Sequence, residues 1–145
     1  AKEAHELALR LAQGFELAGI LAIELFVTKD ERVIVNELAP RPHNSGHYTI
    51  EACSFDQFDA HIRGIAGWPL EQPELLKPAV MVNVLGQHVA PTRALIAEHP
   101  EWNMHDYCKA EVRHDRKMGH ITVLTDDTRQ TVADLERTGC WDDLK

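Results

Sequence analysis

Two glutamates interrupt apolar segments that otherwise have the character of β-strands. Glu24 lies within residues 20–28 (ILAIELFVT), and Glu37 lies within residues 33–38 (VIVNEL). The polar residues 29–32 separate the two segments, so the pattern predicts a hairpin. Because apolar residues occupy both faces of the first segment, we expect a sheet that is covered on both sides.

The spacing of this hairpin predicts that the two carboxylates face each other. An even-length turn centred on residues 30 and 31 gives three facing pairs: Thr28 with Val33, Phe26 with Val35, and Glu24 with Glu37. A three-residue turn with a bulge would make the glutamates diagonal neighbours instead. Opposed side chains lie about 5 Å apart, and at an effective dielectric constant of about 20 their charges repel by roughly 3 kcal/mol.

This repulsion requires a shared proton, a neighbouring cation or a bound divalent metal. Magnesium suits the pair, because it prefers oxygen ligands and commonly takes one or two protein carboxylates together with phosphates and water. Asn36 and Arg41 lie beside the glutamates in the sequence. The alternative is a glutamate at each end of a solvent-exposed edge hairpin.

A loop with two prolines follows the second glutamate directly. Residues 39–47 read Ala-Pro-Arg-Pro-His-Asn-Ser-Gly-His, and the prolines and glycine break every regular period. Arg41 can bind a carboxylate or phosphate through two parallel hydrogen bonds. His43 or His47 can donate to an oxyanion or move a proton near neutral pH. A lone loop histidine is more often structural, but this cluster favours anion chemistry.

A second group of basic residues lies far along the chain. Residues 109–117 contain, within nine positions of an acidic protein, Lys109, Arg113, His114, Arg116 and Lys117. Such a cluster suits a ligand that carries a phosphate. A solvated turn between two strands is the alternative.

Helices are expected on either side of the hairpin. Apolar residues recur at helical spacing from the start of the chain to Phe15, without an N-cap, as in a piece of a longer protein. A second amphipathic helix begins after Ser54, with Gln57 at capping-box spacing, and ends at Gly67. Together these elements form a first unit of residues 1–68.

Residues 69–78 contain prolines without a clear period and are the expected connection to a second unit, residues 79–145. This unit is predicted to contain strands at 79–85, 107–112 and 121–125 and helices at 91–98 and 128–137. Asp126, Asp127 or Thr128 can cap the last helix, and Gly139 can stop it. The expected fold is α+β: an antiparallel sheet with flanking helices, followed by a small β-rich subdomain.

The hairpin and its loop carry a family resemblance. AGILAIELFV followed by VIVNELAPRPHNSGHYTIEAC closely resembles the 5-(carboxyamino)imidazole ribonucleotide synthases, a family of ATP-grasp ligases in purine biosynthesis. The later segments MVNVLG and RKMGHITVL fit the closing domain of the same family. The resemblance implies that the chain is the second half of an ATP-grasp domain with a small carboxyl-terminal subdomain. Its partner would be the missing amino-terminal portion of the same enzyme.

The resemblance also implies roles for individual residues. Glu24 and Glu37 match the family's magnesium ligands, which bridge the phosphates of ATP, and Asn36 lies beside them. The positions that match the wall around carboxyphosphate and the aminoimidazole are Arg41 and His43, as catalytic residues, with Asn44, Ser45 and His47. The positions that match the site of the ribonucleotide phosphate are Lys109, Arg116 and Lys117. Many ATP-grasp relatives have a metal-binding asparagine where this chain has Ala39.

The implied reaction is the ATP- and bicarbonate-dependent carboxylation of 5-aminoimidazole ribonucleotide through carboxyphosphate, with magnesium. We expect the fragment alone to be inactive, because it has no recognisable glycine-rich phosphate loop or adenine pocket. Two other ATP-grasp ligases are alternatives, a formate-dependent ribonucleotide transformylase and a biotin carboxylase. A non-catalytic binding or dimerisation module is the alternative from another class.

The composition limits the remaining possibilities. A formal net charge of -8 over 145 residues argues against a nucleic-acid partner. No apolar run approaches the roughly 20 residues that cross a bilayer, so no membrane association is expected. Cys53, Cys108 and Cys140 are odd in number and widely spaced, which favours reduced thiols over a disulfide framework or a zinc site. We therefore expect a cytoplasmic protein, and a homodimer is the expected oligomer.

Overall fold

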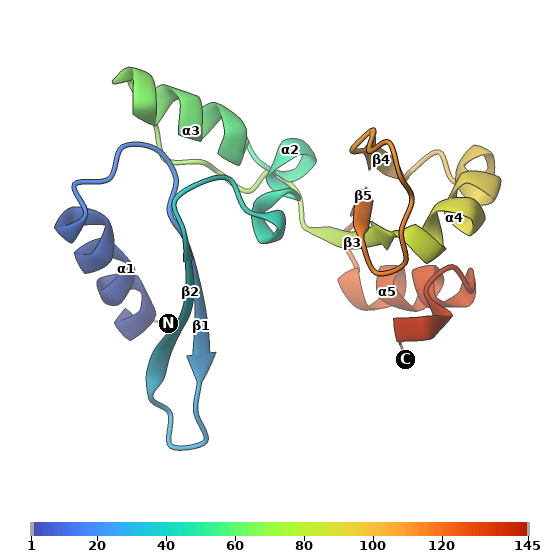
Figure 1. Ribbon diagram of the computed structural model, residues 1–145, viewed down its shortest axis with the longest axis horizontal. Helices are drawn as coiled ribbons and strands as arrows, with labels where there is room; N and C mark the ends of the chain where they lie inside the picture. Colours follow the sequence, from blue (N-terminus) through green and yellow to red (C-terminus); the bar gives the residue numbers. More distant parts are fainter. Residues whose placement is uncertain (1, 145) are drawn as a thin grey trace. The chain divides into compact units, whose positions relative to one another are not determined.

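The computed structural model describes residues 2–144, which form two compact units. The first unit contains the residues up to Ile50 and Phe55–Glu74, and the second contains Glu51–Ser54 and the residues from Leu75 onward. Mixed helices and antiparallel sheets make this an α+β protein, as the sequence predicts. Figure 1 shows the elements in chain order.

The first unit is built from a helix, a hairpin and a second helix. Its principal elements are α1 (Lys2–Gly14), β1 (Ala22–Val27), β2 (Val33–Ala39) and α3 (Gln57–Ala66). Between β2 and α3 the chain makes a single 3₁₀ turn, η1 (Asn44–Gly46), and a one-turn helix, α2 (Thr49–Ala52), which the sequence did not predict. Both are too short to give a periodic signal.

The hairpin pairs the two glutamates by a different route from the predicted one. Glu24 faces Glu37, as expected, but Phe26 faces Ile34 and Val27 faces Val33, so the other two predicted pairs are wrong. The connection between Val27 and Val33 has odd length, which by itself would place Asn36 opposite Glu24. A β-bulge at Asn36 takes up this extra residue and restores the facing glutamates.

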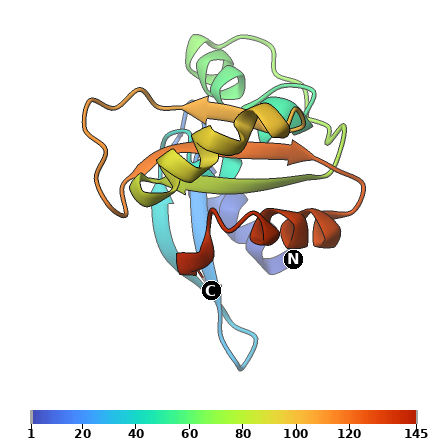
Figure 2. The same ribbon diagram turned by 90° about the vertical axis from the view of Figure 1, so that its right-hand side faces the viewer.

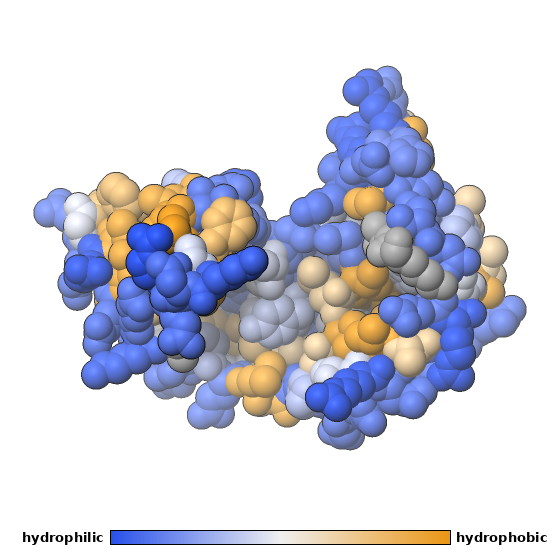
Figure 3. Space-filling model, turned by 90° about the horizontal axis from the view of Figure 1, so that it is seen from below, coloured by the Kyte–Doolittle hydropathy of each residue, from blue (hydrophilic) through white to orange (hydrophobic). Residues whose placement is uncertain are grey.

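The hairpin is not covered on both sides, contrary to the prediction. Phe26 is 58% exposed and Val27 is 72% exposed. Within the described residues the sheet has two strands, so it offers no neighbouring strand to shield these side chains. Figure 3 shows apolar side chains at the surface among the hydrophilic ones.

Helix α3 begins at a different cap from the predicted one. Asp56, not Ser54, is the N-cap, because its Oδ1 accepts hydrogen bonds from the N–H groups of Phe58 and Asp59. Gly67 ends the helix in the left-handed conformation, as expected, with φ of 65°. Gln57 is therefore the first helical residue, and its side chain does not cap the helix.

The second unit is a three-stranded antiparallel sheet with helices. Strand β5 (Lys117–Leu124) lies in the centre, between β3 (Ala79–Leu85) and β4 (Asn103–Asp106). Helix α4 (Val89–Leu95), which two 3₁₀ turns flank, and α5 (Thr128–Arg137) contribute apolar residues to the core on the sheet. In Figure 2, α4 crosses the strands and α5 runs beside them.

The core of this unit follows from strand alternation. Val84 and Ile121 point to one face of the sheet, where Trp102, Leu135 and Trp141 join them. Ile121 has no exposed surface, and both tryptophans are at most 7% exposed. The second unit therefore has a true hydrophobic core.

Three elements of this unit differ from the prediction. Strand β5 begins at Lys117, four residues before the predicted strand 121–125. Residues 107–112 form a loop, and β4 precedes them. The prediction of a strand there followed from Tyr107 and Val112, because aromatic and β-branched residues favour strands. The predicted helix 91–98 begins earlier, and its second half is the 3₁₀ turn η3 (Ile96–Glu98). Helix α5 has the predicted bounds, and Asp127 is its cap.

Candidate functional site

The two glutamates of the hairpin and the side-chain amide of Asn36 lie close together and are exposed to solvent. Glu24 and Glu37 occupy facing positions on β1 and β2. The bulge brings Asn36 to the same place, and its Nδ2 donates to Glu24 Oε2 at 3.2 Å. The Glu24 side chain is 44% exposed, so it remains open to a ligand.

His43, in the loop after β2, contacts one of these two glutamates. Its Nε2 lies 3.5 Å from Glu24 Oε1. The N–H of Ser45 points at His43 Nδ1 at 3.4 Å, and an N–H group can only donate, so Nδ1 is the acceptor. The neutral ring therefore carries its proton on Nε2, toward Glu24.

The rest of the loop is folded by its own backbone. Arg41 is exposed, and its Nη1 donates to the carbonyl of Pro42 at 3.0 Å. Asn44 and Ser45 lie in η1, where the Asn44 carbonyl accepts the N–H of His47 at 3.1 Å. The structure thus gathers Glu24, Asn36, Glu37 and His43 through strand pairing, a hydrogen bond and an ion pair. It places Arg41, Asn44, Ser45 and His47 in the loop that follows.

Gln57 is the residue of this site that sequence reasoning missed. It is 8% exposed, and its side chain binds both backbone groups of His43: Oε1 accepts the N–H at 2.8 Å, and Nε2 donates to the carbonyl at 2.8 Å. The same Nε2 lies 2.7 Å from His47 Nδ1. Its only sequence signal was a polar residue at the start of a helix, which suggested capping.

The basic residues lie in the second unit, on the connection between β4 and β5. We call residues 107–116 the basic loop. Lys109 Nζ donates to the carbonyl of Lys117 at 2.5 Å and lies 5.5 Å from the centre of the Tyr107 ring. Arg116 Nη1 donates to the Glu111 carbonyl at 3.2 Å. The three predicted phosphate contacts, Lys109, Arg116 and Lys117, therefore share one end of β5.

A short turn, η2 (Gly86–His88), holds the basic loop in place. Gln87 Oε1 accepts the N–H of Asp115 at 2.9 Å, and Gln87 Nε2 donates to the Asp115 carboxylate at 3.1 Å. A Cβ on Gly86 would lie 1.9 Å from the carbonyl oxygen of Arg113, so only glycine permits this approach.

The donor set fits a magnesium ion, although it needs ligands from elsewhere. Among residues 2–144 no group of three or more His, Cys, Asp or Glu side chains is arranged to hold a metal. Magnesium commonly uses one or two carboxylates and completes its shell with phosphate oxygens and water. Glu24 and Glu37 supply such a pair, whereas the Ala39 side chain is buried and has no ligand atom.

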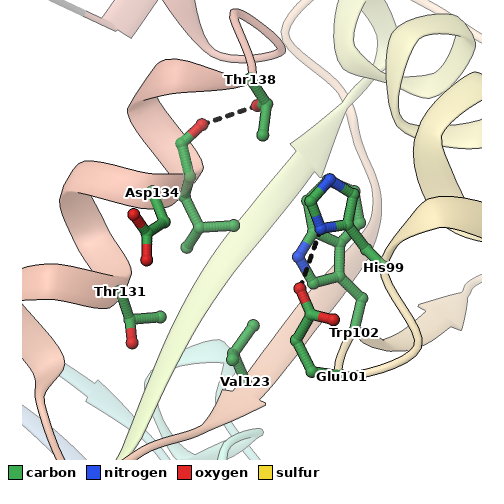
Figure 4. A pocket seen from close by; sticks show the side chains of 8 residues that line it. His99, Glu101, Trp102, Val123, Thr131, Asp134 and Thr138 are labelled. Atoms are coloured by element: carbon green, nitrogen blue, oxygen red, sulfur yellow. Dashed lines mark hydrogen bonds and ion pairs between the residues drawn. The ribbon is translucent and has the colours of Figure 1, made fainter.

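A separate hollow in the second unit has no comparable chemistry. It encloses about 110 Å³ between α5 and the segment around Trp102 (Figure 4). His99 stacks on Trp102 with ring centres 4.1 Å apart and pairs with Glu101 at 2.8 Å. Burial raises the pKa of Glu101, but the hydrogen bond from His99, a backbone hydrogen bond and the charge of His99 together outweigh it, so the pKa lies below its ordinary value. These side chains are paired with one another.

Two family models match the chain, one in each unit. The ATP-grasp domain matches residues 1–58, and the phosphoribosylaminoimidazole carboxylase C-terminal domain matches residues 79–134. N5-carboxyaminoimidazole ribonucleotide synthase of Staphylococcus aureus (strain COL) is 48% identical over 134 residues, which is 92% of this chain and 36% of that protein. The chain belongs to the N5-carboxyaminoimidazole ribonucleotide synthase family. This is the family that the sequence resembles, under a synonymous name.

Solved structures of the family share the fold of this chain. The Staphylococcus aureus synthetase complexed with ADP matches with a TM-score of 0.88 and 46% identity, over 94% of this chain and 37% of that one. The Aspergillus clavatus enzyme, in complex with ADP and 5-aminoimidazole ribonucleotide, matches with a TM-score of 0.83 and 33% identity, over 94% of this chain and 38% of that one.

The chain spans little more than a third of the length of these family members. None of the helices formed by residues 2–144 combines the length and the apolar character needed to cross a membrane.

Proposed function

We propose that the protein is an ATP-dependent carbon–nitrogen ligase that carboxylates 5-aminoimidazole ribonucleotide with bicarbonate, to give 5-(carboxyamino)imidazole ribonucleotide in purine biosynthesis. The facing pair of Glu24 and Glu37, with Asn36 and His43 against it, is the observation that carries the proposal. Relatives solved with ADP and with 5-aminoimidazole ribonucleotide support it.

In the proposed reaction, bicarbonate attacks the γ-phosphorus of ATP and releases ADP, which gives carboxyphosphate. Carboxyphosphate then breaks into carbon dioxide and phosphate, and the exocyclic amine of the ribonucleotide takes up the carbon dioxide and loses a proton. A bound magnesium ion supplies positive charge at the ATP phosphates. Most of the work is positioning and electrostatic stabilisation.

The residues of this chain divide that work. Glu24 and Glu37 hold magnesium, and Asn36 fixes one oxygen of Glu24 through its amide. The groups that meet carboxyphosphate, the leaving phosphate and the aminoimidazole are Arg41, His43, Asn44, Ser45 and His47. The groups that bind the phosphate of the ribonucleotide are Lys109, Arg116 and Lys117.

The decisive experiment is Glu37→Gln in the full-length protein that contains this segment. Removing one of two charged ligands should lower the rate of ATP- and bicarbonate-dependent carboxylation by about 100-fold or more, as removal of one preorganised electrostatic contact does elsewhere. Glu71→Gln, an exposed glutamate outside the site, is the matched control and should keep the full rate. An undiminished rate in Glu37→Gln would refute the metal assignment.

The acceptor is tested separately. ADP release is measured with 5-aminoimidazole ribonucleotide and bicarbonate, with formate and a ribonucleotide acceptor, and with biotin and bicarbonate. Only the first combination should stimulate ADP release, and stimulation by one of the others would replace the proposed reaction by that ligase activity.

A cytoplasmic location and a homodimer complete the proposal, with support from the sequence alone. Sedimentation of the full-length protein at twice its chain mass is the expected result for the dimer.

A further inference from the structure

The buried amide of Gln57 has only one orientation that its backbone partners allow. The His43 N–H can only donate, and the His43 carbonyl can only accept. Turning the amide over would set its NH₂ against an N–H and its oxygen against a carbonyl, which is repulsive at both contacts. Nε2 therefore faces the carbonyl, and the assignment does not depend on any side chain.

The orientation of the Gln57 amide determines which ring nitrogen of His47 carries the proton. One N–H of Gln57 Nε2 serves the His43 carbonyl, and the other points at His47 Nδ1, 2.7 Å away. Because Nε2 of Gln57 is a donor only, His47 Nδ1 must be the acceptor and carries no proton. The neutral ring of His47 then has its proton on Nε2.

Packing around the amide keeps it in this place. Gln57 is the first residue of α3, and its backbone N–H donates to Thr49 Oγ1 at 3.1 Å, while that hydroxyl donates to the Gly46 carbonyl at 2.6 Å. A Cβ at Gly46 would lie 2.6 Å from Gln57 Oε1, so the loop closes onto the amide. The His47 ring stacks on Phe58, the next residue of α3, with ring centres 5.5 Å apart.

We propose that Gln57 is a positioning residue that holds the loop of residues 39–47 and fixes His47 as the neutral ring with its proton on Nε2. For catalysis this rests on the proposed function: His47 then serves as a hydrogen-bond donor to an anionic oxygen of the substrate rather than as a base through Nδ1. Protonation at Nδ1 would set N–H against N–H and break the contact with Gln57.

The first test reads the proton directly and needs no activity. The full-length protein is labelled with ¹⁵N in histidine, and long-range ¹H–¹⁵N correlations assign the protonated nitrogen of each ring, with His47→Asn identifying the His47 signals. The expected result is a protonated Nε2 and a bare Nδ1. A proton on Nδ1 of His47 would overturn the proposal.

Gln57→Glu is the informative variant, because it keeps the shape and replaces the donor by an acceptor. A carboxylate attracts a proton to His47 Nδ1, so that nitrogen should become protonated. Gln72→Glu, an exposed glutamine changed in the same way, is the control and should leave His47 as in the wild type. If Gln57→Glu does not fold, Gln57→Met takes its place and should give a mixture of both neutral forms; a single Nε2-protonated form in either variant would contradict the role of Gln57.

The kinetic test separates positioning from general damage. Gln57→Glu should lower kcat for carboxylation by about 10- to 100-fold, as loss of supporting contacts commonly does, while KM for ATP stays within about twofold. An unchanged kcat would remove the catalytic part of the inference. If the wild type itself has no carboxylation activity, the proposed function fails, and the NMR result still decides the state of His47.

Discussion

Among residues 2–144, four histidine rings accept a hydrogen bond at Nδ1 from a group that can only donate. The donors are backbone N–H groups for His43, His61 and His88, and the Gln57 amide for His47. Each ring is thereby left with its proton on Nε2 when neutral. At the residue scale, the direction in which each of these imidazoles can donate is set by a neighbouring N–H group, from the backbone in three rings and from the Gln57 amide in His47.

In the second unit, the buried ring of His88 makes a hydrogen bond with Asp143. It is 1% exposed, and its Nε2 faces Asp143 Oδ1 at 2.7 Å. Gln87 Nε2 also donates to Asp143, at 2.7 Å. The hydrogen bonds from Gln87 and then His88 hold the pKa of Asp143 below its ordinary value.

This lowered pKa predicts a pH dependence of stability. Because the folded pKa lies below the unfolded value of about 3.9, the contact stabilises the fold above that pH. The stabilisation is lost as the pH falls through the lowered folded pKa. Asp143→Asn should therefore lose less unfolding free energy than the wild type on acidification, measured by urea unfolding followed by tryptophan emission. Glu98→Gln, an exposed carboxylate of the same unit, should keep the wild-type slope; equal slopes for Asp143→Asn and the wild type would refute the linkage.

At the element scale, the two glutamates of the hairpin face each other because a β-bulge compensates for a connection of odd length. The connection of odd length shifts the pairing by one residue, and the bulge at Asn36 shifts it back before Glu24 is reached. Side chains alternate between the two faces of a strand, so a shift of one residue changes every pairing. Without the bulge, Asn36 instead of Glu37 would lie opposite Glu24. The bulge also adds the Asn36 amide as a donor to Glu24.

The basic loop depends on another local element, the η2 turn, and Gly86→Ala tests this dependence. The added methyl group would overlap the Arg113 carbonyl, so the loop must move away. In the full-length protein we expect KM for 5-aminoimidazole ribonucleotide to rise by about tenfold, the effect of losing one charge-assisted contact of roughly 1.4 kcal/mol. KM for ATP should not change.

Gly14→Ala is the matched control for that substitution, because a Cβ there meets nothing within 4 Å. It should leave both KM values unchanged. A Gly86→Ala enzyme with normal KM for the ribonucleotide would show that the position of the basic loop does not matter for substrate binding.

At the scale of the whole molecule, the two units differ in how they are stabilised. The second unit buries Ile121 and two tryptophans in a shared core, whereas the first exposes Phe15 and Phe26 and buries mainly small or polar residues. Hydrophobic burial is the dominant favourable term in folding. The second unit should therefore be the more stable of the two.

The tryptophans allow each unit to be followed separately. Trp68 is 63% exposed and lies in the first unit, while Trp102 and Trp141 are buried in the second. In a Trp68→Phe background, emission reports the second unit alone. Ile121→Ala in this background should lower its unfolding free energy by about 2 to 5 kcal/mol, because it removes a fully buried side chain and leaves a cavity. The exposed Ile62→Ala is the control, and a shift as large in that variant would contradict the separation of the units.

The sequence by itself determined the hairpin that carries the two glutamates, the long helices, the antiparallel fold class and the family. These depend on periodicity and on dense local motifs, which need no distant partner. Tertiary structure decided the bulge at Asn36, the cap at Asp56 and the loop in place of a strand at residues 107–112. It also decided the role of Gln57, because a buried amide acquires its function only when a loop ten or more residues away closes onto it.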